Sequence, residues 1–280
     1  MRKTAIFIVA YNTCRFLPKQ LELIKKYCTD EQYVIYVINN SSDSSSEIND
    51  KIEYEANRTG AVYLKIITPK NSNPSCSHAD ACNFIYREVG FFFDYCLFLD
   101  HDIFPIKSFS IKEILKDKMM AGIEEVRLNG EKKVQYLWLG LLFINNIAIS
   151  DSDKELVDFM PTSKYGVMLD TGGGLHGLLE KNGGNNFIFL DKTAHSNAAF
   201  NKNRYSYYSI VNDGGWMHFI NGSNWANLES EDDRIDSLFC ILENRLLYFS
   251  PARAKSEDIK GREWSFYIFN KKISIKISNK

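Results

Sequence analysis

Two carboxylates, Asp100 and Asp102, stand two residues apart directly after the apolar segment Tyr95–Leu99. A continuous apolar run of this kind is typical of a strand buried on both faces. Acids at the carboxyl end of such a strand lie where ligands bind in parallel sheets. Their hard oxygen atoms suit Mg²⁺ or Mn²⁺, and such a cation can bridge a diphosphate. The pattern therefore predicts a divalent metal site, with a pair of exposed loop acids as the alternative.

A third carboxylate, Asp170, follows the apolar residues 167–169 and precedes three glycines. We interpret residues 170–183 as a helix with Asp170 at its start, where the helix dipole stabilises a charged carboxylate. Such a group can take the proton from a hydroxyl nucleophile. A simple helix N-cap is the other interpretation of Asp170.

Two late histidines, His195 and His218, are candidate metal ligands, because neutral imidazole binds divalent cations. We favour His218, because its flanking glycines and the nearby Ser223 and Asn224 suit a loop that faces phosphate. A hydrogen-bonded structural histidine is the alternative in both cases.

The elements that position these residues alternate along the first hundred positions. Apolar runs predict strands at 5–10, 33–38, 62–68 and 95–99, and helical spacing predicts helices at 17–28, 48–57 and 78–89. This alternation predicts a parallel, doubly wound sheet. The pattern then loosens, with strands expected at 134–144 and 187–190 and a loop at 201–215.

The strand ends carry a family resemblance. Ile6–Asn12 leads through a helix to Val34–Asp43, and these segments resemble the GT-A glycosyltransferases, whose first strand ends in Tyr-Asn and whose second ends in Asp-Asp-Gly-Ser-x-Asp. Here residues 39–43 read Asn-Asn-Ser-Ser-Asp, without the two leading acids and the glycine. Residues 73–83 resemble a helix start of that family, and residues 100–102 occupy the place of its metal motif.

The second half of the chain adds weaker similarity. Leu139–Asn145 resembles the strand that lines the donor-sugar pocket, and residues 169–183 resemble a Glu-Asp-x-x-Leu helix. Leu169 replaces the glutamate, so only Asp170 carries over, and it would be the general base of an inverting enzyme. The missing glutamate leaves a retaining mechanism open. His195 follows Asp170 at a spacing similar to that of the family's metal-binding histidine.

The resemblance implies an α/β, Rossmann-like GT-A fold with a mostly parallel central sheet flanked by helices and a smaller mixed acceptor-side part. Residues 1–105 would form the nucleotide-sugar-binding half, 106–250 the acceptor-side half, and 251–280 a basic C-terminal segment. The implied activity is metal-dependent transfer of a hexose-type sugar from a nucleotide sugar to a glycan or lipid-linked hydroxyl. A non-catalytic nucleotide- or carbohydrate-binding protein on a degenerate scaffold is the alternative, supported by the acids missing at 39 and 40.

The resemblance also assigns site residues. Contacts to the nucleotide sugar are expected from Ala10, Tyr11, Asn12, Asn39, Asn83, Asp100 and His101. The metal, Mn²⁺ or Mg²⁺, is expected on Asp100, Asp102 and His218, with His195 as the second candidate. Asp170 is the expected catalytic residue.

The composition of the 280-residue chain is 45% hydrophobic, with a net charge of −1. A nucleic-acid-binding protein needs a basic field that this chain lacks as a whole. The apolar stretch 137–149 is too short and too interrupted to span a membrane. The basic start followed by residues 5–11 resembles a signal peptide, but we interpret it as a buried strand.

Six cysteines without a C-x-x-C pair indicate a reducing, cytoplasmic location. Residues 251–280 hold eight lysines and arginines against three acids, and isoleucines alternate with polar residues at 273–277. This segment predicts a solvated edge strand. Its charge would alternatively provide a peripheral contact with anionic lipid at the inner face of a membrane, or with an acidic partner.

Overall fold

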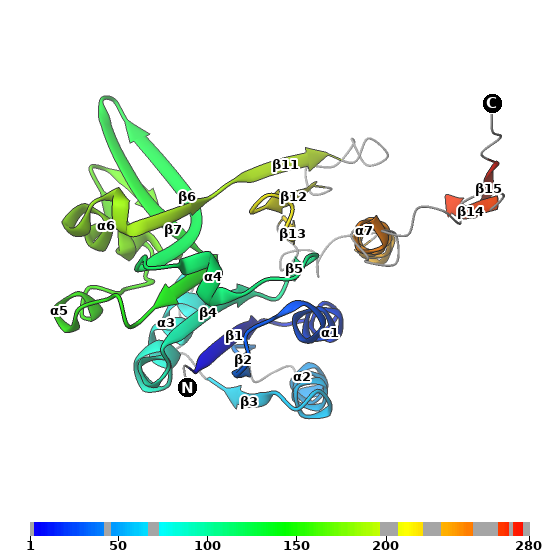
Figure 1. The fold of residues 1–280 in the computed structure, drawn as a ribbon, viewed down its shortest axis with the longest axis horizontal. Coiled ribbons are helices and arrows are strands. Elements are labelled where there is room, and N and C mark those ends of the chain that lie inside the picture. Colours follow the sequence, from blue (N-terminus) through cyan, green and yellow to red (C-terminus); the bar gives the residue numbers. More distant parts are fainter. Residues whose placement is uncertain are drawn as a thin grey trace.

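The structure, a computed structural model, describes residues 3–41, 46–66, 73–196, 207–220, 231–248, 263–268 and 271–276. Its centre is a seven-stranded sheet in the order β10-β6-β7-β4-β1-β2-β3 (Figure 1). Four of the six strand pairs are parallel, and the two pairs that involve β7 are antiparallel. The predicted α/β class with a mostly parallel sheet is confirmed.

Six of the seven strands of this sheet overlap the apolar runs of the sequence, whereas the strand at 120–129 was not predicted. The strands are β1 (Thr4–Ala10), β2 (Tyr33–Asn39), β3 (Val62–Lys65), β4 (Tyr95–Asp100), β6 (Met120–Asn129), β7 (Lys132–Asn145) and β10 (Phe187–Leu190). All seven residues of β1 are buried, because this central strand is covered on both faces. The interpretation of the chain start as a buried strand is therefore confirmed.

Helices cover both faces of the sheet (Figure 1). Apolar residues of α1 (Leu17–Tyr27), α2 (Ser46–Arg58), α4 (Ile111–Leu115) and α7 (Glu231–Tyr248) pack in one core with Ile6, Ile8 and Leu99. Those of α3 (Pro74–Glu88) and α6 (His176–Asn182) pack in a second core with Phe7, Val9 and Phe98. Alternate residues of β1 and β4 thus point into different cores, as the two-residue period of a strand requires.

A second sheet carries the chain beyond the predicted metal motif. It has four strands in the order β11-β12-β13-β5, with β5 (Ile103–Pro105), β11 (Lys192–Ser196), β12 (Tyr207–Val211) and β13 (Trp216–Phe219). Asp100 ends β4, and Ile103 begins β5. The two residues between them therefore form a turn from one sheet into the other.

The structure corrects two expectations about the second half. Residues 207–211, predicted as loop, form β12, because their backbone groups pair with β11 and β13. The helix predicted from Asp170 begins only at His176, after the 3₁₀ turn η2 (Gly173–Leu175). Gly172 adopts a φ of +88°, and this left-handed conformation prevents a helix from starting at Asp170.

The remaining elements are short. They are β8 (Thr162–Lys164), β9 (Val167–Leu169), α5 (Asp151–Lys154), η1 (Gly90–Phe92) and η3 (Gly184–Asn186), and a separate pair of antiparallel strands, β14 (Glu263–Ile268) and β15 (Lys271–Lys276). The strand expected in the basic C-terminal segment is thus present and pairs with β14. Several predicted residues lie outside the described residues: 251–262, 269–270 and 277–280 of that segment, 201–206 of the expected loop, and Ser223 and Asn224.

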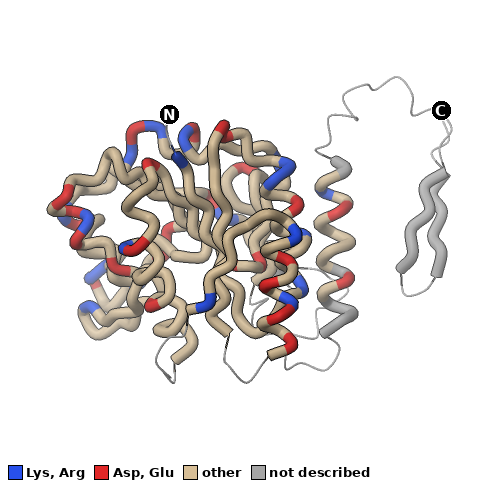
Figure 2. Tube along the Cα trace, turned by 90° about the horizontal axis from the view of Figure 1, so that it is seen from below, with Lys and Arg blue, Asp and Glu red and all other residues tan. Residues whose placement is uncertain are grey.

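Acidic and basic residues are interspersed over the part of the chain drawn in Figure 2, without a large region of one sign in that view. Among the described residues, no helix combines the length and apolar character needed to cross a bilayer.

Candidate active site

The turn that carries Asp102 is buried between the two sheets. The backbone N–H of Phe219 on β13 donates to the carbonyl oxygen of Asp102 over 2.9 Å, so the second sheet fixes the turn from one side. Asp102 is 3% exposed, whereas the side chain of Asp100 is 25% exposed. The two acids therefore differ in exposure: both line the same cavity, but Asp102 is much more deeply buried than Asp100.

His218 reaches this turn through strand pairing. It lies opposite Ile103 in the antiparallel pair β13–β5, and its Nε2 is 3.8 Å from Oδ1 of Asp102. Its Nδ1 shares a 3.4 Å hydrogen bond with Oγ of Ser209. Burial lowers the pKa of His218 to about 3, and the positive charge of Lys192 adds to this effect. The imidazole is therefore neutral at physiological pH, which is the form that binds metals.

His195, the second candidate ligand, lies elsewhere. It is on β11 and stacks on Tyr208 with ring centroids 5.2 Å apart. It does not line the cavity that contains Asp100 and Asp102. The structure thus brings His218 to the predicted metal site and leaves His195 in a packing position.

The ring of His101, the first residue of the turn, packs against the protein interior. Its Nδ1 is 3.1 Å from the carbonyl oxygen of Val9, so this nitrogen must carry the proton of the neutral ring. Its ring stacks on Phe16, the residue that precedes α1. Burial lowers the pKa of His101. These contacts indicate that the ring supports the turn, although it also borders the cavity.

At the end of β2, the residue that lines the cavity is one position later than the expected nucleotide contact Asn39. Asn39 is fully buried, and its amide bonds to Asn49, the Tyr63 hydroxyl and the backbone N–H of Ser41. Asn40 lines the cavity instead, with its amide held by Oγ of Ser77.

Of the four other residues predicted to contact the nucleotide sugar from the strand ends and from α3, one lines the cavity and three do not. Tyr11 lines the cavity, whereas Ala10, Asn12 and Asn83 do not. Asn12 has a φ of 50° and donates its backbone N–H to Oγ of Ser41. Asn83 bonds to Asp158 and to the backbone N–H of Phe159, which places it in a structural role.

Helix α3 contributes a residue that sequence reasoning missed. Nε2 of His78 lies 3.3 Å from Oδ1 of Asp100, and His78 lines the cavity beside Pro74 and Ser75. The helix begins four residues earlier than predicted, with Asn73 as N-cap and Pro74 in the first turn. Asparagine followed by proline is a helix-start signal that would have placed His78 one turn inside the helix, on the side of the strand ends.

Asp170 also lines the cavity. It follows β9, is exposed, and accepts the backbone N–H of Thr171 on Oδ1 over 2.8 Å. A β-carbon on Gly172 would lie 2.1 Å from the carbonyl oxygen of Leu137, so this loop packs directly on the backbone of β7. The expected helix N-terminus at Asp170 is therefore wrong, because close packing on β7 and the left-handed glycine delay the helix.

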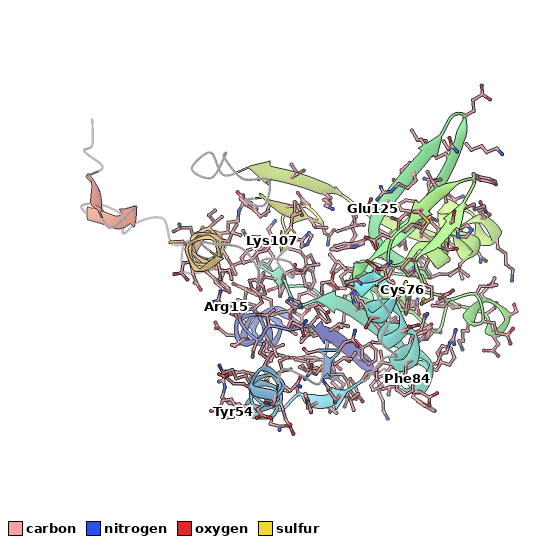
Figure 3. All side chains as sticks on the ribbon, turned by 180° about the vertical axis from the view of Figure 1, so that it is seen from behind. Arg15, Tyr54, Cys76, Phe84, Lys107 and Glu125 are labelled. Atoms are coloured by element: carbon pink, nitrogen blue, oxygen red, sulfur yellow. The ribbon has the colours of Figure 1, made fainter. Side chains whose placement is uncertain are left out.

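Trp138 on β7 also lines the cavity, and sequence reasoning missed it too. A β-carbon on Gly140 would lie 2.2 Å from Cη2 of Trp138 and 2.7 Å from Oδ2 of Asp100, so the ring covers the place of the missing side chain. The ring is 4.9 Å from that of His218, and the ammonium of Lys192 lies 5.4 Å from its centroid. Oε1 of Glu125, labelled in Figure 3, lies 3.9 Å from this ammonium.

These residues surround one cavity of about 260 Å³ at the carboxyl edge of the parallel strands. Its lining consists of Val9, Tyr11, Asn40, Pro74, Ser75, His78, Asp100, His101, Asp102, Trp138, Asp170, Thr171 and His218. Among the described residues, no group of three or more acidic, histidine or cysteine side chains is arranged so that it could hold a metal ion. Magnesium-type ions at phosphate sites commonly use one or two carboxylates and complete their shell with water and substrate oxygens. Asp100 and Asp102 could supply the carboxylates of such an open site, and the neutral imidazole of His218 lies beside Asp102.

No family model matches the chain, and no curated protein matches it. A solved structure that resembles it is glucosyl-3-phosphoglycerate synthase from Mycobacterium tuberculosis in complex with phosphoglyceric acid. That similarity has a TM-score of 0.43 and 14% sequence identity, and it covers 67% of this chain and 69% of the other. The interpretation of the site therefore depends on this chain's own residues.

Proposed function

We propose that the protein is a metal-dependent glycosyltransferase that transfers a sugar from a nucleotide sugar to a hydroxyl of a glycan or lipid-linked acceptor. The observation that carries this proposal is the single cavity lined by Asp100, Asp102, His218 and Asp170. The fold brings these four residues together from β4, β13 and the loop after β9 at the edge where ligands bind in parallel sheets.

Asp100, Asp102 and His218 would hold Mn²⁺ or Mg²⁺. When bound, the cation would stabilise the negative charge that develops on a diphosphate leaving group. Tyr11 and Asn40 line the part of the cavity formed by the ends of β1 and β2, and we assign them to the nucleoside. This replaces Asn39, whose amide is committed to Asn49 and Tyr63.

Asp170 would act as the general base. The acceptor oxygen forms a bond to the anomeric carbon, the bond from that carbon to the diphosphate oxygen breaks, and the nucleoside diphosphate leaves with its electron pair. The acceptor proton passes to Oδ2 of Asp170, the oxygen that the Thr171 N–H does not hold. A single displacement of this kind inverts the anomeric configuration.

A ligand screen tests the proposal directly. Melting temperatures measured with a panel of nucleoside diphosphates and nucleotide sugars, each with Mn²⁺ or with EDTA, should rise only for a matching donor with the metal. Nucleotide binding without any metal effect would contradict the metal site. Metal-dependent binding without donor hydrolysis or transfer would instead favour the non-catalytic binding protein.

Replacement of the proposed base provides the second test. Asp170→Asn should lower turnover by a factor on the order of a hundred while donor affinity stays unchanged. A structural cap would behave differently, with a loss of about 1 kcal/mol in unfolding free energy and unchanged turnover. Near-normal turnover, or a product with retained anomeric configuration, would reject Asp170 as the base.

We further propose a peripheral membrane contact through the basic segment 251–280, where a lipid-linked acceptor would reside. Co-sedimentation with phosphatidylserine vesicles should exceed that with phosphatidylcholine vesicles and should weaken as salt is raised. Binding that ignores both lipid charge and salt would remove this proposal.

A further inference from the structure

Gln20 on α1 contacts residues 100–103, called the metal turn below because they carry the proposed metal ligands Asp100 and Asp102, from inside the protein. It is fully buried, and its Nε2 donates to the carbonyl oxygen of Asp100 over 2.7 Å and to that of Ile103 over 2.6 Å. These two carbonyls flank His101 and Asp102 on either side. One side-chain amide therefore ties both ends of the turn to a helix that lies some eighty positions earlier in the sequence.

The turn needs such a support because it passes from one sheet to the other. Asp100 is the last residue of β4 and Ile103 the first of β5, so neither strand alone holds the two residues between them. A buried carbonyl without a donor is costly, so the two hydrogen bonds of Gln20 stabilise this backbone path. The N–H of Phe219 fixes the Asp102 carbonyl from the other side.

The same face of α1 also holds the side chain at the centre of the turn. Phe16 lies one helical turn before Gln20, and its ring stacks on that of His101 at a centroid distance of 5.7 Å. Oε1 of Gln20 is buried and has no hydrogen-bond partner among the described residues. Because Oε1 makes no such bond, the side chain of Gln20 supports the turn through the two hydrogens on its Nε2.

We propose that Gln20 is a positioning residue for the metal carboxylates. It acts through the backbone: by fixing the carbonyls of Asp100 and Ile103, it sets the direction in which the two carboxylates leave the turn. The inference rests on the proposed function insofar as it assigns the turn to metal binding. Residues that orient metal ligands from behind typically affect metal affinity by 10- to 100-fold.

The chain offers a matched control at the opposite edge of the sheet. Asn146 is also buried, and its Nδ2 donates to the carbonyl oxygens of Gly90 and Phe93 over 2.9 and 2.8 Å. It lies next to the start of β4, whereas Gln20 holds the end of β4. Both amides thus clamp two carbonyls, but only Gln20 touches the turn.

The test compares Gln20→Met with Asn146→Leu in the full-length protein. Mn²⁺ affinity is measured from the electron paramagnetic resonance signal of free Mn²⁺, and backbone opening is measured by amide hydrogen exchange with mass spectrometry. We expect Gln20→Met to weaken Mn²⁺ binding about tenfold or more and to speed exchange at residues 100–104. Asn146→Leu should speed exchange at residues 90–94 and leave Mn²⁺ affinity within about twofold of wild type.

Equal Mn²⁺ affinity in Gln20→Met and wild type, or an equal loss in both variants, would overturn the inference. If the wild-type protein binds no Mn²⁺, the metal part of the proposed function fails, and hydrogen exchange alone decides whether Gln20 positions the turn. Exchange that is unchanged at 100–104, or raised equally across the chain, would then reject it. If Gln20→Met does not fold, Gln20→Asn keeps the amide one methylene short of the two carbonyls and is judged by the same two measurements.

Discussion

At the amino-terminal edge of the central sheet, Asn146 uses its whole side chain: its Nδ2 donates to two carbonyls, and its Oδ1 accepts the hydroxyl of Tyr86 over 2.7 Å. At the carboxyl edge, Gln20 makes the same pair of donor bonds but leaves Oε1 unpaired among the described residues. Nε2 of the nearby His101 is likewise buried without a described partner.

This difference separates a structural network from a site. A network whose donors and acceptors are all paired stabilises the fold and specifies one packing. Buried polar atoms without partners cost stability, and native proteins keep them mainly where function requires them. The carboxyl edge also holds Asp102 and His218 in the interior, a combination that a purely structural region would avoid.

The largest expected difference between the two edges concerns the acids next to β4. Asp102→Asn should reduce donor hydrolysis and transfer by a factor on the order of a hundred or more, because it removes a charged ligand of the proposed cation. Asp94→Asn, just before the amino end of the same strand, should leave both activities unchanged, since among the described residues its side chain accepts the backbone N–H of Lys3 and does not line the cavity. Activity assays with Mn²⁺ and with EDTA measure this, and full activity of Asp102→Asn would contradict the metal site.

Two glycines with positive φ, Gly172 beside the cavity and Gly60 away from it, allow the unfolding free energies of two alanine variants to be compared. Gly172→Ala combines the left-handed strain of about 1–2 kcal/mol with a collision on the Leu137 carbonyl, so we expect a loss of about 3 kcal/mol in unfolding free energy. Gly60→Ala, just before β3, has the strain without any collision, because no heavy atom lies within 4 Å, and should cost about 1 kcal/mol. Urea denaturation distinguishes them, and equal losses would show that the loop of Asp170 does not depend on packing against β7.

Part of the loss of folding stability at low pH should also come from the carboxyl edge. The pKa of His218 is about 3 in the folded chain, below its ordinary value, so below pH 6.5 the unfolded chain binds a proton that the folded chain excludes. Stability from this group is complete above pH 6.5 and falls as the pH drops, by at most about 1.4 kcal/mol per pH unit. His218→Gln should therefore reduce the slope of melting temperature between pH 6.5 and 4 in EDTA. A remaining slope is expected from His101, whose pKa burial also lowers. An unchanged slope would show that His218 does not titrate as a buried group.

The smallest effect is expected at the amino edge. Tyr86→Phe removes the hydroxyl that Asn146 accepts and should cost about 1 kcal/mol in unfolding free energy. Mn²⁺ affinity should stay unchanged, because the clamp at Gly90 and Phe93 lies at the far end of β4 from the metal turn. A weakened affinity would mean that the two edges are coupled along the strand, and the distinction between network and site would not hold.

The sequence alone was sufficient for features that depend on local chemistry. Continuous apolar runs predicted β1, β2 and β4, because a strand covered on both faces needs apolar residues at every position. The acids at 100 and 102 were correctly placed at the end of such a strand. Their place at a sheet edge follows directly from their position in the chain.

Tertiary structure decided which side chains face the cavity. Asn40 rather than Asn39 lines it, because Asn49 and Tyr63 from neighbouring elements bind the Asn39 amide. His218 rather than His195 meets Asp102, because the β13–β5 register sets it opposite Ile103. Such choices depend on the register between strands far apart in the sequence, which no local pattern encodes.

The same reason explains the residues that the sequence did not reveal. His78, Trp138 and Gln20 belong to three elements with unremarkable patterns, and each acquires its role only when its element packs beside β4. Asp170 shows the reverse case, since its position in the sequence indicated a helix start. The packing of Gly172 on the backbone of β7 placed it in a loop instead. Sequence therefore determined the strands and the acids at their ends, and the long-range contacts of a closely packed interior determined the geometry of the site.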